Sequence, residues 1–90
     1  MPKYAIEIKN SAIKELEKLQ EKDYDKVSQL IFSLADDPRP SGCKKLKEFR
    51  LGDRAAYRVR IGKFRVIYTI EDDVLEVYIV KVGHRKDIYS

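Results

Sequence analysis

This chain of 90 residues has one cysteine, Cys43, and one histidine, His84. A lone cysteine excludes an intrachain disulfide, and the two side chains together are too few for a tetrahedral structural zinc site. The sequence also lacks a glycine-rich phosphate loop and any paired-cysteine motif, which excludes P-loop and dinucleotide-fold chemistry. We therefore expect a protein that uses no metal and no cofactor.

Long apolar segments are also missing. No apolar run approaches the roughly 20 residues that a membrane-spanning helix requires, and the polar start MPKYAIEIKN is unlike a signal peptide. The length suits one domain, residues 1–90, with one modest hydrophobic core. These absences favour a cytoplasmic protein with no membrane partner.

The charge is moderately basic. Nineteen Lys and Arg stand against 15 Asp and Glu, giving a net charge of +4. Most of the excess lies in the second half of the chain, where the sequence is richest in predicted strands. This balance is compatible with nucleic acid or with an acidic protein partner.

The first half of the chain predicts a strand and two helices. KYAIEIK alternates polar and apolar residues, which indicates a strand from Lys3 to Lys9. Ser11 is the expected N-cap of the first helix. The second helix ends before Pro38, which cannot continue it. Its apolar stripe consists of Tyr24, Val27, Leu30, Ile31 and Leu34.

The second half predicts strands only. KKLKEF is typical of a short edge strand, because its lysines discourage pairing with another sheet. Longer strands are expected at Arg54–Ile61, Phe64–Glu71 and Val74–Val82, joined by turns at GK and DD. The sequence therefore predicts an α+β fold: an N-terminal strand, a two-helix hairpin, and an antiparallel meander sheet with the helices packed on one face.

The stretch YRVRIGKFRVIY predicts a hairpin that gathers arginines. A two-residue loop at Gly62 and Lys63 places Arg60 opposite Arg65, with Arg58 on the same face. Like charges in opposite positions destabilise a sheet, so this cluster favours an anion site over a merely solvated face. The face turned to the helices consists of Tyr57, Val59, Ile61, Phe64, Val66 and Tyr68.

The last strand and the C-terminal tail extend this cluster. A two-residue loop at Asp72 and Asp73 pairs Ile67 with Tyr78, which adds Tyr78 to the arginine face. Gly83 permits a bend, after which the tail folds over that face. The predicted catalytic set is Arg58, Arg60, Arg65, Arg85, His84 and Tyr89. The predicted RNA contacts are Lys44, Lys45, Lys47, Tyr78 and Lys86.

This set of side chains suits cleavage of RNA. Arginine keeps its charge and its rigid fork fits a phosphodiester, including the extra negative charge of a pentavalent transition state. Histidine accepts a proton near neutral pH, and tyrosine stacks on a base or donates its phenolic proton. RNA supplies its own nucleophile, the ribose 2′-OH. A ribonuclease of this kind needs no metal.

Three segments of the chain together resemble the RelE/ParE superfamily of bacterial toxins, most closely its RelE branch: AIKELEKL, YRVRIGKFRVIYTI and VYIVKVGHRKDIY. The resemblance covers essentially the whole chain, in order. The resemblance implies a ribosome-dependent mRNA interferase that cuts mRNA in the A site, leaves a 2′,3′-cyclic phosphate, contacts ribosomal RNA and is neutralised by a RelB-like antitoxin. It assigns the family's functional positions to the arginines listed above and to Tyr89.

One departure leaves the general base open. Some RelE toxins carry lysines where this chain has Arg58 and Arg60, and arginine cannot accept a proton at useful pH. We favour His84 as the base. Two other functions also fit the resemblance: a ParE-like toxin that inhibits DNA gyrase by binding, and a catalytically silent RNA- or ribosome-binding relative.

Overall fold

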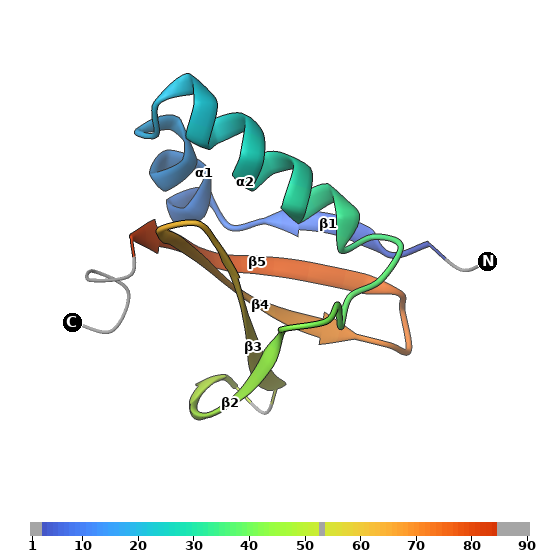
Figure 1. Cartoon of the computed structure of the whole chain (residues 1–90). Coiled ribbons are helices and arrows are strands. Elements are labelled where there is room, and N and C mark those ends of the chain that lie inside the picture. The colour runs from blue at the N-terminus through green and yellow to red at the C-terminus, as the bar shows by residue number, and fades with distance from the viewer. Residues whose placement is uncertain (1–2, 53, 85–90) are drawn as a thin grey trace.

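The computed structural model describes residues 3–52 and 54–84. Its elements, in chain order, are β1 (Ala5–Ile8), α1 (Asn10–Glu17), α2 (Glu21–Ser33), β2 (Lys44–Leu51), β3 (Arg54–Ile61), β4 (Phe64–Glu71) and β5 (Glu76–His84). The strands form one sheet in the order β1-β5-β4-β3-β2, shown in Figure 1. The predicted α+β class is confirmed, and β2 is an edge strand as predicted. No helix among these residues is long and apolar enough to cross a membrane.

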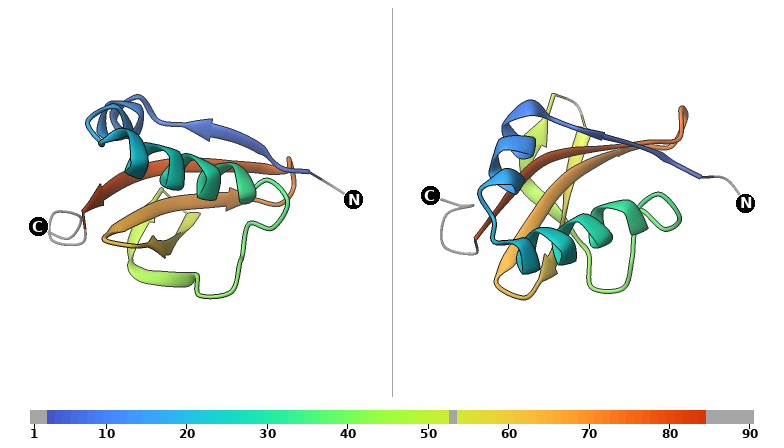
Figure 2. Two further views of the ribbon diagram at one scale, coloured as in Figure 1. Left: turned by 45° about the horizontal axis from the view of Figure 1, so that its top comes forward. Right: turned by 90° about the horizontal axis from the view of Figure 1, so that it is seen from above.

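The sheet is mixed. The three long strands form the predicted antiparallel meander, and β1 joins its other edge in parallel with β5. Both helices lie on the same face of the sheet, as the two views of Figure 2 show. The core lies between the helices and the sheet, with Val59, Val66 and Tyr68 from the sheet packed against Leu16 and Ile31 from the helices. The predicted helix-facing side of the hairpin is therefore correct.

The loop after α2 is fixed to the sheet by one buried hydrogen bond. The Tyr68 hydroxyl donates to the Pro38 carbonyl oxygen at 2.8 Å, and both residues are buried. Burial raises the pKa of Tyr68, so this hydroxyl keeps its proton and remains a donor. The contact holds the start of the loop that leads to β2 against the middle of β4.

Two local expectations were wrong. Ser11 does not cap α1, because the helix begins at Asn10, two residues before the Ala12 start that a cap at Ser11 implies. The cap position belongs to Lys9, whose backbone N–H donates to Ile79 in the last contact of β1 with β5. Lys9 is thus the single residue between β1 and α1, and its side chain makes no capping hydrogen bond.

The turn between β4 and β5 is longer than predicted. It takes four residues, from Asp72 to Leu75, and β5 begins at Glu76 instead of Val74. Leu75 adopts a φ of 52°, the left-handed conformation that a leucine seldom takes and that no sequence pattern indicated. The longer turn shifts the partners of β5, so that Tyr78 pairs with Thr69 instead of Ile67.

The buried bond of Tyr68 yields a stability prediction. Tyr68→Phe leaves the buried Pro38 carbonyl without its donor, which we expect to lower the free energy of unfolding by about 1–3 kcal/mol. Urea denaturation measures the change. Tyr24→Phe is the matched control, because Tyr24 lies 43% exposed on α2 and its hydroxyl is accessible to water. Equal stability of the two variants would show that the Tyr68 bond does not anchor the loop.

Candidate anion-binding face

The three hairpin arginines share the sheet face opposite the helices. Arg58 pairs with Ile67 across β3 and β4, and Arg60 pairs with Arg65, as the sequence predicted. Residues directly opposite each other lie on one face, so all three guanidinium groups belong to the same side of the sheet. The structure adds that Arg58 and Arg65 are each only 7% exposed, whereas Arg60 is exposed.

A buried arginine is an unusual feature. The guanidinium group cannot be neutralised at physiological pH, so burying it costs free energy that other interactions must offset. The Nε atom of Arg58 has no hydrogen-bond partner within the part of the chain that the structure describes. Beside it lies a small apolar cluster of Ala56 and Ile67 with Leu46. The face therefore holds fixed positive charge beside apolar side chains, where attraction to an anion is stronger than in open water.

A hollow of about 310 Å³ lies next to these arginines, where β2 begins. It is lined by Ser41, Gly42, Lys44, Arg58, Val59 and Arg60. Lys44 pairs with Arg58, so its side chain also belongs to the arginine face. Gly42 has a φ of 90°, a conformation that favours glycine and that turns the loop along the rim. Three cations and two small residues thus surround a space open to a phosphate group.

The predicted lysines of β2 divide between the two faces. Lys45 pairs with Tyr57, whose ring packs against the helix-side core. Lys45 therefore lies on the helix side of the sheet, whereas Lys44 lies on the side of Arg58. Lys47 is exposed further along the strand. Tyr78 pairs with Thr69 and does lie on the arginine face. The predicted partner of Tyr78 was wrong, but a shift of two residues keeps a side chain on the same face.

His84 occupies a different position. It pairs with Phe64 at the end of β5, and the two rings meet edge to face with centroids 5.9 Å apart. Phe64 packs against the helix-side core, so the register brings His84 to that side and not into the row of Arg60 and Arg65. The predicted residues Arg85, Lys86 and Tyr89 lie outside the described residues.

Sequence reasoning missed Lys81. Lys81 pairs with Ile67 because β5 contains one extra residue, Val80, between the partners of Tyr68 and Ile67. The predicted two-residue turn placed Val80 on the arginine face and Lys81 on the other. The only signal in the sequence is weak: the adjacent apolar residues Ile79 and Val80 interrupt the strand alternation.

The loop that lines the hollow is tied to the far end of the sheet through Arg39. Its guanidinium donates two hydrogen bonds to Asp72, at 2.9 and 3.3 Å, and lies 5.3 Å from the centre of the Tyr57 ring. The Tyr4 hydroxyl donates to the same carboxylate at 2.7 Å. Arg39 and Tyr4 together lower the pKa of Asp72. The sequence indicated only an ordinary turn residue at Asp72, whereas the structure makes it the anchor of two segments.

This anchor predicts a pH-dependent contribution to stability. The pKa of Asp72 is lower in the folded protein than the usual value of about 3.9, so its ion pair stabilises the fold above about pH 4. That stabilisation disappears as the pH falls through the lowered pKa. We expect Asp72→Asn to be less stable than wild type at neutral pH, with the difference shrinking below about pH 4.

Chemical denaturation at several pH values tests this expectation. Asp73→Asn is the control, because it makes the same chemical change one residue along the turn. A deficit of Asp72→Asn that stays constant from neutral to acidic pH would show that the charge of Asp72 is not what holds the loop. A loss of stability in Asp72→Asn that equals the loss in Asp73→Asn would also show that the charge of Asp72 does not hold the loop.

The chain combines a mixed five-stranded sheet with two helices on one face and a cationic opposite face. Residues 6–89 match the family described as "ParE toxin of type II toxin-antitoxin system, parDE". The chain belongs to this family of toxins, the RelE/ParE superfamily, and the predicted resemblance is confirmed.

Individual relatives carry RelE names. The chain is 34% identical over 88 residues to a protein of Methanocaldococcus jannaschii described as "Putative toxin RelE1", covering 98% of this chain and 97% of that protein. It is 28% identical, with a TM-score of 0.80, to a chain of the archaeal RelE-RelB complex from Pyrococcus horikoshii, covering 97% and 99% of the two chains. A chain of the RelBE2 toxin-antitoxin complex from Mycobacterium tuberculosis gives the same identity and TM-score, with 97% of each chain covered.

Proposed function

We propose that this toxin is a ribosome-dependent endoribonuclease that cleaves mRNA in the A site. The observation that carries the proposal is the pair of buried, permanently charged arginines, Arg58 and Arg65, on the face that also holds Arg60. Fixed guanidinium groups beside apolar side chains suit a phosphodiester whose charge grows during reaction. The similarity to proteins named RelE also supports cleavage of mRNA.

The proposed reaction is an internal transesterification. The ribose 2′-oxygen loses its proton and bonds to the adjacent phosphorus, the bond from phosphorus to the 5′-oxygen breaks, and the leaving oxygen takes up a proton. The products are a 2′,3′-cyclic phosphate and a free 5′-hydroxyl. The arginines stabilise the additional negative charge of the pentavalent transition state, a role that requires no metal ion.

The proton carriers in this proposal are His84 and Tyr89. The chain has a single histidine, and imidazole is the side chain whose ordinary pKa lies near neutrality. His84 follows Gly83, the partner of Arg65, at the end of β5, and its ring lies on the helix side against Phe64. We propose His84 as the proton acceptor, with Arg85, Lys86 and Tyr89 contributing from the tail that follows it.

The proposed partner in the cell is a RelB-like antitoxin. The similar chains from Pyrococcus horikoshii and Mycobacterium tuberculosis were solved as toxin-antitoxin complexes. An antitoxin that offers acidic side chains to Arg60 and Lys44 would compete with RNA for the same face. Cytoplasmic ribosomes, with their mRNA and ribosomal RNA, are the proposed target.

A gyrase-directed toxin is the second candidate, because the matching family description names ParE. Such a toxin acts by binding and leaves RNA intact. A silent relative that only binds RNA or the ribosome would also leave it intact. The two cleavage experiments below therefore separate the proposed function from both alternatives.

The first prediction concerns Arg65. On ribosomes programmed with a defined mRNA, we expect Arg65→Ala to lower the cleavage rate by at least roughly 10²-fold, because it removes a donor to the transition state. Arg54→Ala is the matched control: Arg54 lies on β3 four residues before Arg58 and is ion-paired with Glu71 at 2.6 Å. We expect that control to cleave like wild type.

Arg65 is buried, so its replacement must also be shown to fold. Arg65→Lys keeps the charge and the aliphatic stem but loses the bidentate fork, and it should melt near wild type while cleaving more slowly. Circular dichroism checks the folded state of each variant. A folded Arg65→Ala that cleaves as fast as Arg54→Ala would remove Arg65 from the site.

The second prediction concerns His84. If His84 accepts the proton of the 2′-hydroxyl, His84→Gln should slow cleavage by roughly 10²- to 10⁴-fold. The same ribosome assay measures the rate, and circular dichroism checks that the variant folds. An unchanged cleavage rate would exclude His84 as the base and leave it a packing partner of Phe64.

A further inference from the structure

An irregularity in β5 redirects one lysine. Ile79 and Val82 both lie in the helix-side core although they are three residues apart, because Val80 is an extra residue in the strand. A bulge of this kind reverses the alternation of the side chains that follow it. Lys81 consequently faces the side of Ile67 and the arginines, where a regular strand would have placed Val80.

The bulge completes a line of positive charge across the sheet. The register joins Lys44 to Arg58, Arg58 to Ile67 and Ile67 to Lys81, one residue on each of four neighbouring strands. Adjacent strands lie about 4.8 Å apart, so the line extends roughly 14 Å. Its centre is the buried Ile67, and cations stand on both sides of it.

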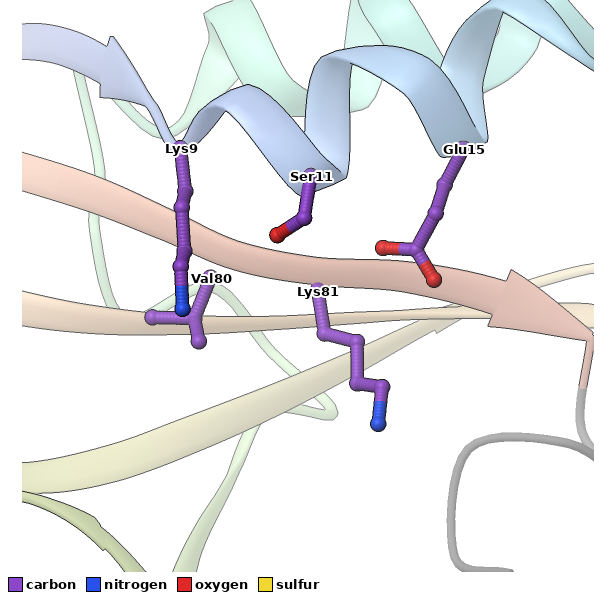
Figure 3. A pocket seen from close by; sticks show the side chains of 5 residues that line it. All are labelled: Lys9, Ser11, Glu15, Val80 and Lys81. Carbon is purple, nitrogen blue, oxygen red and sulfur yellow. The ribbon is translucent and has the colours of Figure 1, made fainter.

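The line continues past the edge of β5. Lys9, Ser11, Glu15, Val80 and Lys81 line a cleft of about 390 Å³ between α1 and this edge. Figure 3 shows the amino groups of Lys9 and Lys81 on the same side of the β5 ribbon, with the carboxylate of Glu15 turned toward the same cleft. Glu15 also accepts a hydrogen bond from the backbone N–H of Val82 at 3.1 Å, which fixes its position.

We infer that Lys81 and Lys9 form an RNA-backbone contact that extends the cleavage face around the edge of β5. The inference rests on the proposed function, which supplies RNA as the ligand. Lysine is a compact charge that neutralises phosphates without reading bases, so the contact would strengthen binding to any single-stranded sequence. Glu15 carries the opposing charge in this cleft and would weaken the same contact.

The composition of this surface favours RNA over a protein partner. Protein interfaces depend on a few large apolar or aromatic anchors. Among the described residues, the exposed large apolar side chains lie elsewhere: Ile13, Tyr24 and Phe32 on the helices, and Val74 and Leu75 in the turn before β5. The cleft offers two lysines, a serine, one carboxylate and a single valine, a mainly polar lining that suits recognition of a nucleic-acid backbone.

The test measures binding apart from cleavage. A short fluorescent 2′-O-methyl RNA lacks the attacking hydroxyl and cannot be cut by the proposed reaction. Fluorescence anisotropy over a series of salt concentrations gives the affinity and its salt dependence for wild type, Lys81→Gln, Lys9→Gln, Glu15→Gln and Lys22→Gln. Lys22 is an exposed lysine of α2 that does not line the cleft, and it serves as the charge-matched control.

The variants should change the affinity for RNA in opposite directions. Lys81→Gln and Lys9→Gln should each bind more weakly, with the slope of log K against log salt reduced by about 0.7. Glu15→Gln, whose amide oxygen can still accept from Val82, should bind more tightly, and Lys22→Gln should match wild type. If all four variants match wild type, the inference is wrong while the proposed function stands. If wild type fails to bind the RNA at all, the inference is also wrong, whereas the proposed ribosome-dependent cleavage is overturned only by intact mRNA on programmed ribosomes.

Discussion

The pairing of β3 with β4 is the constraint on which the site and the core both depend. One register sends Val59, Val66 and Tyr68 into the core under the helices and sends Arg58, Arg60 and Arg65 to the opposite face. A slip of one residue would exchange the two sets, turning the three arginines toward the helices and the core side chains away from them. The free energy gained by burying the core side chains therefore also holds the three arginines close together on the opposite face.

That crowding is costly to the fold. Arg60 stands opposite Arg65, and two of the three arginines are nearly inaccessible to water. Neither feature stabilises a sheet, because like charges repel and buried charges lose hydration. Such violations of folding rules are expected where a site needs charge in a fixed place, and here they coincide with a hollow lined by Lys44, Arg58 and Arg60.

Much of this arrangement was predictable from local patterns. The alternation in YRVRIGKFRVIY, with a glycine at the tip, defines both strands and their pairing, and the bounds of β3 and β4 agree with the prediction. Helix α2 follows from its apolar stripe, of which Val27, Ile31 and Leu34 are buried. Membership of the RelE/ParE superfamily was also recognisable from motifs in the sequence.

The parts that escaped prediction depend on tertiary structure or on single backbone irregularities. The left-handed Leu75 lengthens a turn, and the bulge at Val80 brings Lys81 onto the arginine face. Alternation rules assume regular strands and cannot locate an extra residue inside an apolar run. The role of Asp72 depends on Arg39 and Tyr4, which are distant in sequence and meet it only in the folded chain.

The chemistry of the cut RNA ends tests the proposed function most directly. Wild-type protein would be incubated with programmed ribosomes, and the ends of the mRNA fragments would be mapped and identified. Attack by the ribose 2′-OH predicts cleavage in the A site with a 2′,3′-cyclic phosphate upstream, and no cleavage when the attacked nucleotide is replaced by its 2′-deoxy form. Intact mRNA in the presence of a folded, growth-inhibiting protein would contradict it, as would ends that carry a 3′-hydroxyl.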